Sequence, residues 1–417
     1  MRCACLAVLA FLLLPVASLQ AGGWPEFRGP TGQGHYQDGK LPVTWNSTKN
    51  IAWKREIPGR GWSSPVVFDG KIYLTTAVPL TDGGPDDQSL RALCLDAVTG
   101  RTVWEKEVFR EDGATAPPVH IKNSHASATP VVGGNKLYVH FGHQGTACLD
   151  LSGNILWQNR SLHYNPVHGN GGSPILVDNL LIFSCDGGDQ AFVAALEAST
   201  GKLRWKTERS VEADRRFSFS TPLLITVNGR KQLISPSSGA VYAYDPETGK
   251  EIWLVRYDGY SVIPRPVCGH GLVFISTGYN APSLLAIRPD GRGDITDTHI
   301  AWRTNHAAPH APCPLLVGEE LYMVSDNGIA SCLDAKTGRR HWGEQRIGGT
   351  YSASPIDADG KIYFLSEQGT GIVIKAGRRY EKLASNALEE SALASYAAAD
   401  GALFIRTQNH LYRIETK

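Results

Sequence analysis

The chain repeats one short phrase, and that phrase decides its fold. The first copy is Asp96-Ala97-Val98-Thr99-Gly100-Arg101-Thr102-Val103-Trp104, in which the Trp follows the Gly by four residues. The same spacing returns at Gly153–Trp157, Gly201–Trp205, Gly249–Trp253 and Gly338–Trp342, and Trp53 and Trp302 stand in related but less regular settings. Self-similarity at about forty to fifty residues is typical of a solenoid, a propeller or an array.

A second marker precedes each copy of the phrase. It consists of a small or polar residue, a proline and an apolar run, and its prolines are Pro65, Pro130, Pro174, Pro222, Pro266, Pro314 and Pro355, with an eighth, proline-less copy at Ser395-Tyr396-Ala397. Within one copy, short runs of β-branched and aromatic residues alternate with turns such as Asp69-Gly70, which is the pattern of strands and hairpins. Four strands in about 45 residues is the size of a propeller blade.

The two ends of the array predict a closed ring. The last copy ends at Leu411-Tyr412-Arg413-Ile414 without a fourth strand, whereas Ile51–Ile57 supplies an extra strand at the start. If the N-terminal strand completes the last blade, the ring closes and leaves no sheet edge that would invite aggregation. We therefore predict an all-β, eight-bladed β-propeller that spans residues 51–417 as one domain.

The repeated tryptophans are expected to be structural. Their constant distance from a tight turn places each ring on the same face of its blade, where it can fill the gap between blades that widens outward. The set is Trp53, Trp104, Trp157, Trp205, Trp253, Trp302 and Trp342. Two copies depart from the pattern: the fifth carries an insertion at 288–294, and the seventh has Glu381 where its Trp would stand.

Residues 1–21 predict a secretory signal peptide. One positive charge at Arg2 precedes an apolar run to Leu14, and small residues follow. No later stretch approaches the about 20 apolar residues of a membrane span, and Cys3 and Cys5 come too early to accept a lipid. We expect an exported, unanchored protein, periplasmic or extracellular, with an N-terminal extension at 22–50.

The net charge argues against a nucleic-acid partner, and the cysteine positions argue against disulfides. The formal net charge is +1 and falls to zero without Arg2, which is the sole charge before Gly22, whereas a nucleic-acid surface would be basic. Cys94, Cys148 and Cys332 hold the same position in different repeats and should lie far apart, so we expect buried thiols rather than disulfides. We expect a monomer with no nucleic-acid partner and no transmembrane segment.

The iterated Asp/Glu-x-x-Thr-Gly-x-x-x-Trp phrase resembles the repeat of pyrroloquinoline quinone (PQQ)-like propellers, with their tryptophan docking motifs. The resemblance covers Ile51 to Lys417, and the lead segment Trp24–Gly34 is similar to the start of exported PQQ-like propellers of planctomycete-type bacteria. The resemblance extends to two kinds of relative. One is the outer-membrane β-barrel assembly lipoprotein, a non-enzymatic eight-bladed propeller, and the other is the quinoprotein dehydrogenases, which hold PQQ and calcium at the channel.

One rim of the predicted ring is expected to carry function. The Asp-Gly and Thr-Gly turns share one rim and are nearly alike, whereas the loops of the other rim differ between copies, and divergent loops on a rigid scaffold carry function. The candidate ligand- or partner-binding residues are Arg60, Trp62, His125, His143, His168, Asn170, Asp186, Arg265, His310, Tyr351 and Glu367; Asp189, Arg216, Tyr279 and Asp326 lie in the same loops. They could bind a polar or anionic ligand or a peptide loop. The alternative for a residue such as Asp186 is a turn role. We expect charge reversal at Arg265 to abolish capture and to leave stability unchanged.

Three functions from different classes remain open. The favoured one is a non-catalytic binding or scaffold propeller with a protein partner or small polar ligand and no cofactor. The alternative that the resemblance implies is a dehydrogenase of alcohols or sugars that uses PQQ and calcium, but adjacent cysteines are absent, and Arg60, Trp62 and Arg265 would imitate a quinone site only loosely. The third is a hydrolase or sugar-binding protein that uses rim carboxylates and histidines. No metal site is predicted, because the acidic loop Pro79–Ser89 has no EF-hand-like spacing.

Overall fold

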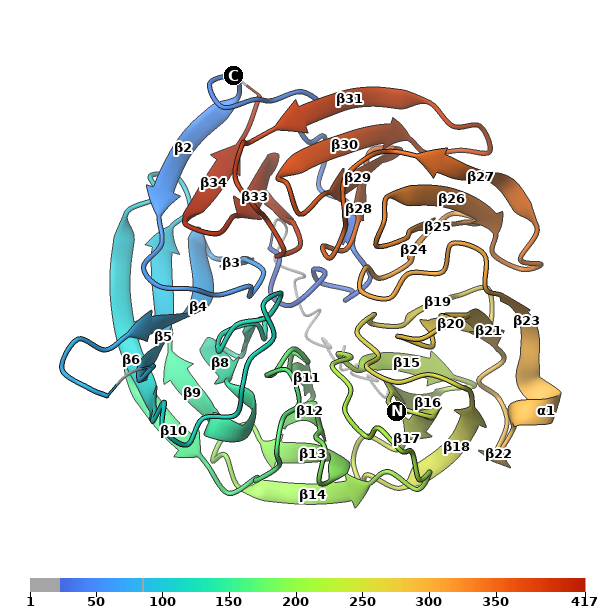
Figure 1. Cartoon of the computed structure of the whole chain (residues 1–417), viewed down its shortest axis with the longest axis horizontal. Helices are drawn as coiled ribbons and strands as arrows, with labels where there is room; N and C mark the ends of the chain where they lie inside the picture. Colours follow the sequence, from blue (N-terminus) through green and yellow to red (C-terminus); the bar gives the residue numbers. More distant parts are fainter. Residues whose placement is uncertain (1–22, 85, 417) are drawn as a thin grey trace, which may run out of the picture.

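Eight four-stranded sheets form a closed ring around a central channel (Figure 1). The computed structural model describes residues 23–84 and 86–416. The predicted signal peptide at 1–21 lies outside the described residues. The fold is an all-β, eight-bladed propeller as predicted, and within the described residues its helical content is limited to the 3₁₀ turn η1 (Gly142–Gln144) and α1 (Thr296–His299).

Each of blades 1 to 7 runs from an innermost to an outermost strand in chain order, and blade 8 takes its outermost strand from the start of the chain. Blades 1 to 4 consist of β3 (Val66–Phe68), β4 (Lys71–Pro79), β5 (Gln88–Asp96), β6 (Thr102–Glu111); β7 (Val131–Gly133), β8 (Lys136–His140), β9 (Thr146–Asp150), β10 (Ile155–Asn159); β11 (Ile175–Val177), β12 (Leu180–Asp186), β13 (Ala191–Glu197), β14 (Leu203–Glu208); and β15 (Leu223–Val227), β16 (Arg230–Pro236), β17 (Ala240–Tyr244), β18 (Glu251–Arg256).

Blades 5 to 8 follow the same order, with two short additions. They consist of β19 (Val267–Gly269), β20 (Leu272–Ser276), β21 (Leu284–Ile287), β23 (Ile300–Thr304); β24 (Leu315–Val317), β25 (Glu320–Val324), β26 (Ile329–Asp334), β27 (Arg340–Arg346); β28 (Ile356–Ala358), β29 (Lys361–Leu365), β30 (Thr370–Lys375), β31 (Lys382–Ala387); and β32 (Ala397–Ala399), β33 (Ala402–Arg406), β34 (His410–Ile414), β2 (Ile51–Glu56). β1 (His35–Tyr36) joins blade 7 and β22 (Gly293–Asp294) joins blade 4.

The ring closes through its N-terminal strand, as predicted. β2 pairs antiparallel with β34, with Ile51 opposite Ile414 and Lys54 opposite Tyr412. The eighth blade is therefore built from both ends of the array, so that separating the ends requires breaking a sheet as well as a packing interface.

The repeated tryptophans link each blade to the next. The indole nitrogen of Trp104 donates to Leu151 O at 2.9 Å, and that of Trp205 donates to Pro246 O at 3.1 Å. Trp53, Trp157, Trp302 and Trp342 make the same bond to the following blade. Each of the turn glycines 100, 153, 201, 249 and 338 has positive φ and lies so close to the indole of the preceding blade that a Cβ would collide with it. Each Gly-to-Trp phrase thus supplies both the turn that receives the indole of the preceding blade and the indole that packs on the turn of the following blade.

Blade 4 shows how the inserted segment of blade 5 is accommodated. There Trp253 donates to the side chain of Gln232 at 2.8 Å instead of a neighbouring carbonyl, and Gln232 in turn donates to Pro289 O at 3.1 Å. The amide side chain relays the link to blade 5, because the insertion displaces the usual turn. Residues 293–294 of the insertion also pair with β18 and cover that sheet edge.

Blade 7 lacks its tryptophan where its partner turn is also missing. The turn that would receive it in blade 8 is interrupted, because β34 and β2 come from opposite ends of the array. Trp45 of the N-terminal extension fills this region instead: its backbone N–H donates to Asn386 at 2.9 Å, its ring lies against Gly371, and it is 3% exposed.

The N-terminal extension enters the channel of the ring. Residues 24–36, named the plug here, are drawn in blue near the centre of Figure 1. Trp24 exchanges two backbone bonds with Val67 in blade 1, the carbonyl of Pro25 accepts from Val132 in blade 2, and β1 pairs with β28 in blade 7. In addition, Tyr36 accepts from the amide of Gly401 in blade 8. The side chain of Gln33 also accepts the amide of Cys268 in blade 5, opposite blade 1, so the plug ties the ring together from within.

The cysteines occupy the core. Cys94, Cys148, Cys185, Cys313 and Cys332 are buried, Cys268 is half-buried, and all six are free thiols in the described part of the chain. Burial raises the pKa of Cys94 to about 12. The buried position expected for Cys94, Cys148 and Cys332 is confirmed. Across residues 23–84 and 86–416, no helix has the length and apolar character needed to span a bilayer.

Candidate functional site

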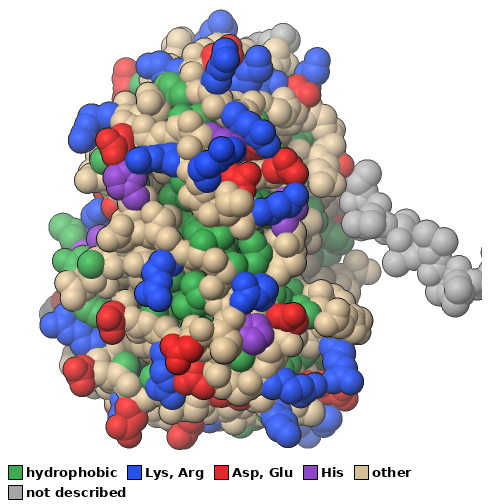
Figure 2. All heavy atoms as spheres, turned by 90° about the vertical axis from the view of Figure 1, so that its right-hand side faces the viewer, with side chains coloured by type: hydrophobic (Ala, Val, Ile, Leu, Met, Phe, Trp, Pro, Cys, Tyr) green, Lys and Arg blue, Asp and Glu red, His purple; other side chains and the backbone are tan. Residues whose placement is uncertain are grey.

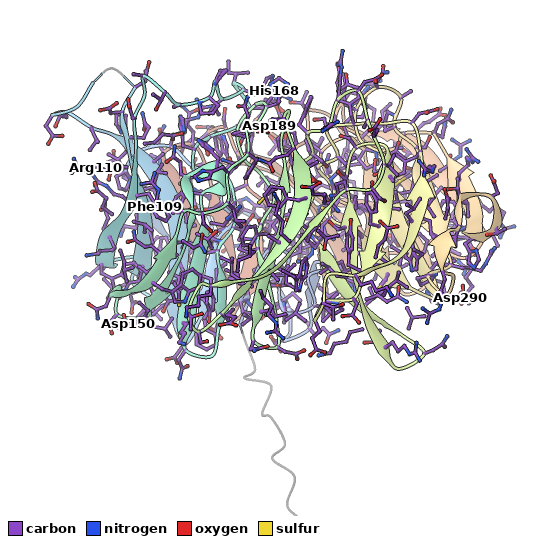
Figure 3. The ribbon with its side chains drawn as sticks, turned by 90° about the horizontal axis from the view of Figure 1, so that it is seen from below. Phe109, Arg110, Asp150, His168, Asp189 and Asp290 are labelled. Atoms are coloured by element: carbon purple, nitrogen blue, oxygen red, sulfur yellow. The ribbon has the colours of Figure 1, made fainter. Side chains whose placement is uncertain are left out.

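The two rims of the ring differ as the sequence predicted. Figure 3 shows His168 and Asp189 at one rim and Asp150 and Asp290 at the other. The rim of Asp150 is formed by the turns between first and second and between third and fourth strands, and is named the turn rim. The opposite one, formed by the loops that enter each innermost strand and those between second and third strands, is named the mouth rim.

The mouth rim opens into a cavity of about 660 Å³ at the end of the channel. Its floor includes Phe27 from the plug, and its walls come from loops of nearly every blade. Its larger polar, aromatic and apolar side chains include Trp62, His120, Lys122, Asn123, His168, Arg215, Phe217, Tyr260, Ile263, Tyr279, His310 and Asp326. The plug thus converts an open channel into a blind pocket that faces a single rim.

A belt of hydroxyl groups holds the wall of this cavity. The residue before each marker proline accepts, through its side chain, the backbone N–H of the equivalent residue one blade earlier: Ser64 N donates to Thr129 Oγ1 at 2.9 Å, and Thr129 N donates to Ser173 Oγ at 2.9 Å. The series continues through Thr221, Cys313, Ser354 and Ser395, and it returns to Ser64. The belt explains the small or polar residue that precedes proline in the sequence.

Arg265 stands at the one break in the belt. Its side chain is a donor and offers no acceptor to the backbone N–H of Thr221, the equivalent residue one blade earlier. The Nε of Arg265 donates instead to Pro222 O at 3.0 Å. Its Nη1 donates to Phe27 O at 2.6 Å and to Glu26 at 3.1 Å, and the residue is 2% exposed. Arg265 therefore holds the plug rather than facing the open mouth.

An arc of aromatic rings follows one side of the mouth. Neighbouring ring centroids are 5.3–5.7 Å apart along the series His120, His168, Phe217, Tyr260, Tyr279 and His310, in edge-to-face contacts. The loops that enter blades 2 to 6 each contribute at least one ring, and Tyr279 comes from the loop between β20 and β21 of blade 5. Desolvation and the nearby His120 lower the pKa of His168. The arc presents apolar faces with imidazole and phenol edges to the cavity.

A strap of residues 112–128, between blades 1 and 2, forms the rest of the wall. Lys122 reaches Glu367 of blade 7 at 2.9 Å, and His120 N donates to His168 O at 3.2 Å. Glu367 also accepts from Ser352 at 2.6 Å. Burial alone would raise the pKa of Glu367, but the bonds from Lys122 and Ser352 outweigh it and leave the pKa low. The strap is thereby tied to both sides of the mouth.

A buried carboxylate anchors the base of the strap. Glu111 is 2% exposed, contacts His125 Nδ1, and lies 3.3 Å from His143 Nε2. Burial would raise the pKa of Glu111, yet the bonds from the two imidazoles lower it to about 2. Asn170 lies 3.2 Å from His143 Nδ1 and can donate to it. The carboxylate therefore orients both rings and fixes where the strap begins.

The structure separates the predicted site residues into three groups. Trp62, His168 and His310 line the mouth cavity, together with Tyr279 and Asp326. Arg60 and His125 line an adjoining pocket of about 510 Å³ under the strap. The remaining residues act inside the fold: Asn170 and His143 belong to the Glu111 network, Asp186 forms a buried ion pair with Arg209 at 2.9 Å, Glu367 holds the strap, and Arg265 and Tyr351 are buried.

Several mouth residues were missed by the sequence reasoning. His120, Lys122 and Asn123 lie in the strap, and Arg215 and Tyr260 lie in loops entering blades 4 and 5. Their loops were recognised as divergent, but each side chain stands several residues before the marker proline. A search of the full length of each incoming loop for polar and aromatic side chains, Lys and Asn included, would have found them.

The mouth does not fit a calcium-bound quinone. Asp326 is the one carboxylate in the described lining, and its two oxygens accept the amides of His310 at 2.6 Å and Ala311 at 3.2 Å. Burial raises the pKa of Asp326. Calcium takes six to eight oxygen ligands, whereas residues 23–84 and 86–416 contain no group of three or more His, Cys, Asp or Glu placed to hold a metal.

Known proteins resemble the chain in both sequence and fold. A family model described as outer membrane protein assembly factor BamB matches residues 35–162, 94–344 and 193–417. BamB of Yersinia pestis is 25% identical over 218 residues, or 47% of this chain and 52% of that protein. Methanol dehydrogenase (cytochrome c) subunit 1 of Methylorubrum extorquens is 33% identical over 159 residues, or 31% of this chain and 23% of that protein. The chain thus spans about half the length, or less, of these curated relatives.

Solved structures agree in fold. BamB from Moraxella catarrhalis superposes with a TM-score of 0.59 at 10% identity, over 87% of this chain and 99% of that one. Quinohemoprotein alcohol dehydrogenase from Comamonas testosteroni gives 0.52 at 12% identity, over 95% and 81%. These likenesses concern the fold alone. Because the family model matches nearly the whole ring, the chain belongs to the PQQ-like propeller family that is described as outer membrane protein assembly factor BamB.

Proposed function

We propose that this chain is an exported, non-catalytic binding propeller that presents its mouth rim to a protein partner. The proposal rests on how the side chains of the mouth are used. Asp326 in the lining and Glu367 beside it bond to the chain's own groups, whereas aromatic and aliphatic side chains line the cavity and remain available for contact. The BamB relatives are named as assembly factors, which favours a protein partner. Residues 1–21 act as the export signal in this proposal, and the mature chain works as a monomer.

The arrangement of acids and bases supports a binding role over a catalytic one. A general base must reach a substrate, usually beside a group that stabilises developing charge. Glu111 is enclosed by His125 and His143, and Asp326 and Glu367 are occupied by backbone amides, Lys122 and Ser352. The mouth can bind through shape complementarity and apolar contact, which are typical of protein–protein interfaces.

A selection of random displayed peptides against the purified mature chain tests the proposal. We expect enriched peptides to lose at least tenfold in affinity for Tyr279→Ser, because Tyr279 is 54% exposed at the mouth. Val98→Ser is the matched control, since Val98 is 69% exposed on the turn rim. Peptides that bind both variants as well as the wild type would contradict a binding role for the mouth rim.

The second candidate is a dehydrogenase that uses PQQ and calcium, which the 33% identity to methanol dehydrogenase over 31% of the chain favours. Titration of the chain with PQQ, with and without calcium, would report binding through tryptophan fluorescence and thermal melting. We expect no saturation and no shift in Tm. Saturable, calcium-dependent binding with reduction of an electron acceptor would replace the binding proposal with the enzyme.

A further inference from the structure

We propose that the cavity inside the mouth rim binds the end of a neutral saccharide. Such a ligand is additional to the protein partner proposed above, and its binding does not depend on that partner. Three features of the cavity point to it: a ring of hydroxyl groups with unused O–H donors, an aromatic wall outside that ring, and the closed inner end that the plug gives to the channel.

Six hydroxyl groups of the belt accept a hydrogen bond and donate none. They belong to Ser64, Thr129, Ser173, Thr221, Ser354 and Ser395, each of which accepts a backbone N–H from the preceding blade, is at most 6% exposed and lines the cavity. No hydrogen bond leads from any of these hydroxyls to another group of the described chain. A hydroxyl has one donor and two acceptor lone pairs, so each of the six keeps one donor and one lone pair for a ligand.

Buried polar groups are normally hydrogen-bonded, and the groups that can both accept and donate are water and other hydroxyls. A polyol such as a sugar therefore matches the belt group for group, because its hydroxyls can take the place of water without loss of hydrogen bonds. An apolar ligand would leave the six O–H donors unpaired. It would also leave the indole nitrogen of Trp62 unpaired, which lies in the cavity lining and is buried without an acceptor.

The belt favours a neutral ligand over an ion. The charged side chains in the described lining, Lys122, Arg215 and Asp326, lie in loops outside the belt and are bonded to Glu367, to the Tyr260 hydroxyl and to backbone amides. Arg265 holds a belt position, but its guanidinium bonds to the plug. An ion moved from water onto neutral hydroxyls would lose solvation that they cannot replace. The outer wall of the ring differs, because Figure 2 shows basic and acidic side chains spread over it.

The aromatic arc supplies the second kind of contact that a sugar ring makes. A pyranose carries apolar C–H faces beside its hydroxyls, and these faces gain when they leave water for an aromatic surface. Figure 3 shows His168 of the arc at the rim, and His168 stands five residues before Ser173 of the belt. The arc thus lies between the lip and the belt. A saccharide that enters end-on would meet the rings first and the hydroxyls last.

The size and shape of the cavity suit the end of a short chain of sugars. Its volume of about 660 Å³ lies within the range of about 300–1,000 Å³ that is usual for small-molecule pockets. Phe27 of the plug forms part of its floor. Because the plug fills the channel behind the cavity, the ligand enters and leaves through the mouth rim.

Isothermal titration calorimetry of the full mature chain with cellotriose and with maltotriose tests the proposal. We expect saturable binding of at least one of these two neutral trisaccharides. The permethylated form of the same trisaccharide keeps the apolar faces but has no O–H donors, and we expect it not to bind. A trisaccharide of the same linkage that ends in a uronate should bind more weakly than the neutral one.

A matched pair of belt variants locates the site. Cys313 already serves as a sulfur acceptor in the belt, where it accepts the Arg265 N–H at 3.0 Å. A thiol keeps the acceptor but is a weak donor, so Ser173→Cys should weaken saccharide binding about fivefold with little change in Tm. Cys313→Ser adds a hydroxyl to the ring and should bind at least as tightly as the wild type. Ile121→Ser, at a strap residue that is 80% exposed and outside the cavity lining, should change nothing.

Four results would overturn the inference. If neither trisaccharide binds, the belt faces ordered water only. Equal binding of the permethylated form would make the cavity an apolar site, and tighter binding of the uronate would make it an anion site. Equal affinity of Ser173→Cys and the wild type would place the saccharide elsewhere. The selected peptides, with their dependence on Tyr279, test the proposed function separately, so that either proposal can fail without the other.

Discussion

The two rims of this propeller are built from the same strands and obey opposite rules. On the turn rim the copies repeat: Asp96, Asp245 and Asp334 each accept the amide and hydroxyl of the Thr three residues on. On the mouth rim hardly any side chain recurs between blades except in the hydroxyl belt. Repetition therefore marks the contacts that hold the ring, and divergence marks the surface that we propose binds a partner.

The largest expected loss of stability comes from removing a tryptophan that packs on a turn of the turn rim. Trp205→Ala should lower the free energy of unfolding by roughly 3–5 kcal/mol, because it deletes a buried ring that covers Gly249. Tyr279→Ser on the mouth rim should change it by less than about 0.5 kcal/mol. Urea unfolding of the two variants measures the difference. A loss below about 1 kcal/mol for Trp205→Ala would remove the docking account.

The next effect concerns Arg265, which is buried behind the mouth and holds the plug. Arg265→Met should cost roughly 3 kcal/mol, since it strips three bonds and leaves Glu26 without its cation. The structure thus reverses the expectation that Arg265 can change charge without loss of stability. Arg265→Lys keeps the positive charge but loses the several N–H donors of the guanidinium, so its loss of stability should lie between zero and that of Arg265→Met. Wild-type stability of Arg265→Met would show that the plug is not held there.

Acid should weaken the mouth rim through Glu111. Its folded pKa of about 2 lies below the ordinary 4.5, so its contribution is complete above pH 4.5 and is lost as the pH falls towards 2. We expect about 3 kcal/mol to disappear over this range. Urea unfolding at several pH values would show a shallower decline in Glu111→Gln. Parallel profiles for the two proteins would contradict the role of this carboxylate.

The smallest stability effect is expected in the belt, the one repeated feature of the mouth. Thr221→Val keeps the shape but leaves the Ser173 amide, which donates to Thr221 at 2.9 Å, without a partner. We expect a loss of about 1–2 kcal/mol, measured by urea unfolding. Thr221→Ser, which restores the acceptor, should recover most of it. Equal stability of the Val and Ser variants would mean that the belt bond contributes nothing.

The sequence predicts what repeats and misses what occurs once. The strands, the closure by Ile51–Glu56 and the docking tryptophans follow from spacing, because each is one local pattern used many times. The belt was also present in the sequence as a hydroxyl residue before five of the seven marker prolines, although its bonds were not foreseen. The mouth rim was recognised by its divergence.

The plug and the strap could not be derived in the same way. Arg28 donates to Pro314 O, 286 residues away, and Lys122 pairs with Glu367, 245 residues away. Such pairs involve a backbone carbonyl, which every residue has, or a charged side chain of a common type. The sequence therefore does not show which residue the partner is. The same reason explains why Arg265 was expected at the open mouth. Its identity as a cation was visible, but the Phe27 carbonyl and the Glu26 carboxylate that hold it lie in the plug, and its third acceptor is the carbonyl of Pro222.

Hydrogen exchange of the chain, with and without a peptide selected at the mouth, tests the central claim most directly. We predict slower exchange confined to the strap at 116–125 and to the loops at 258–263 and 277–280, with the turn rim unchanged. Protection centred on the turn rim or on the outer strands, with the strap unaffected, would contradict the assignment of binding to the divergent rim.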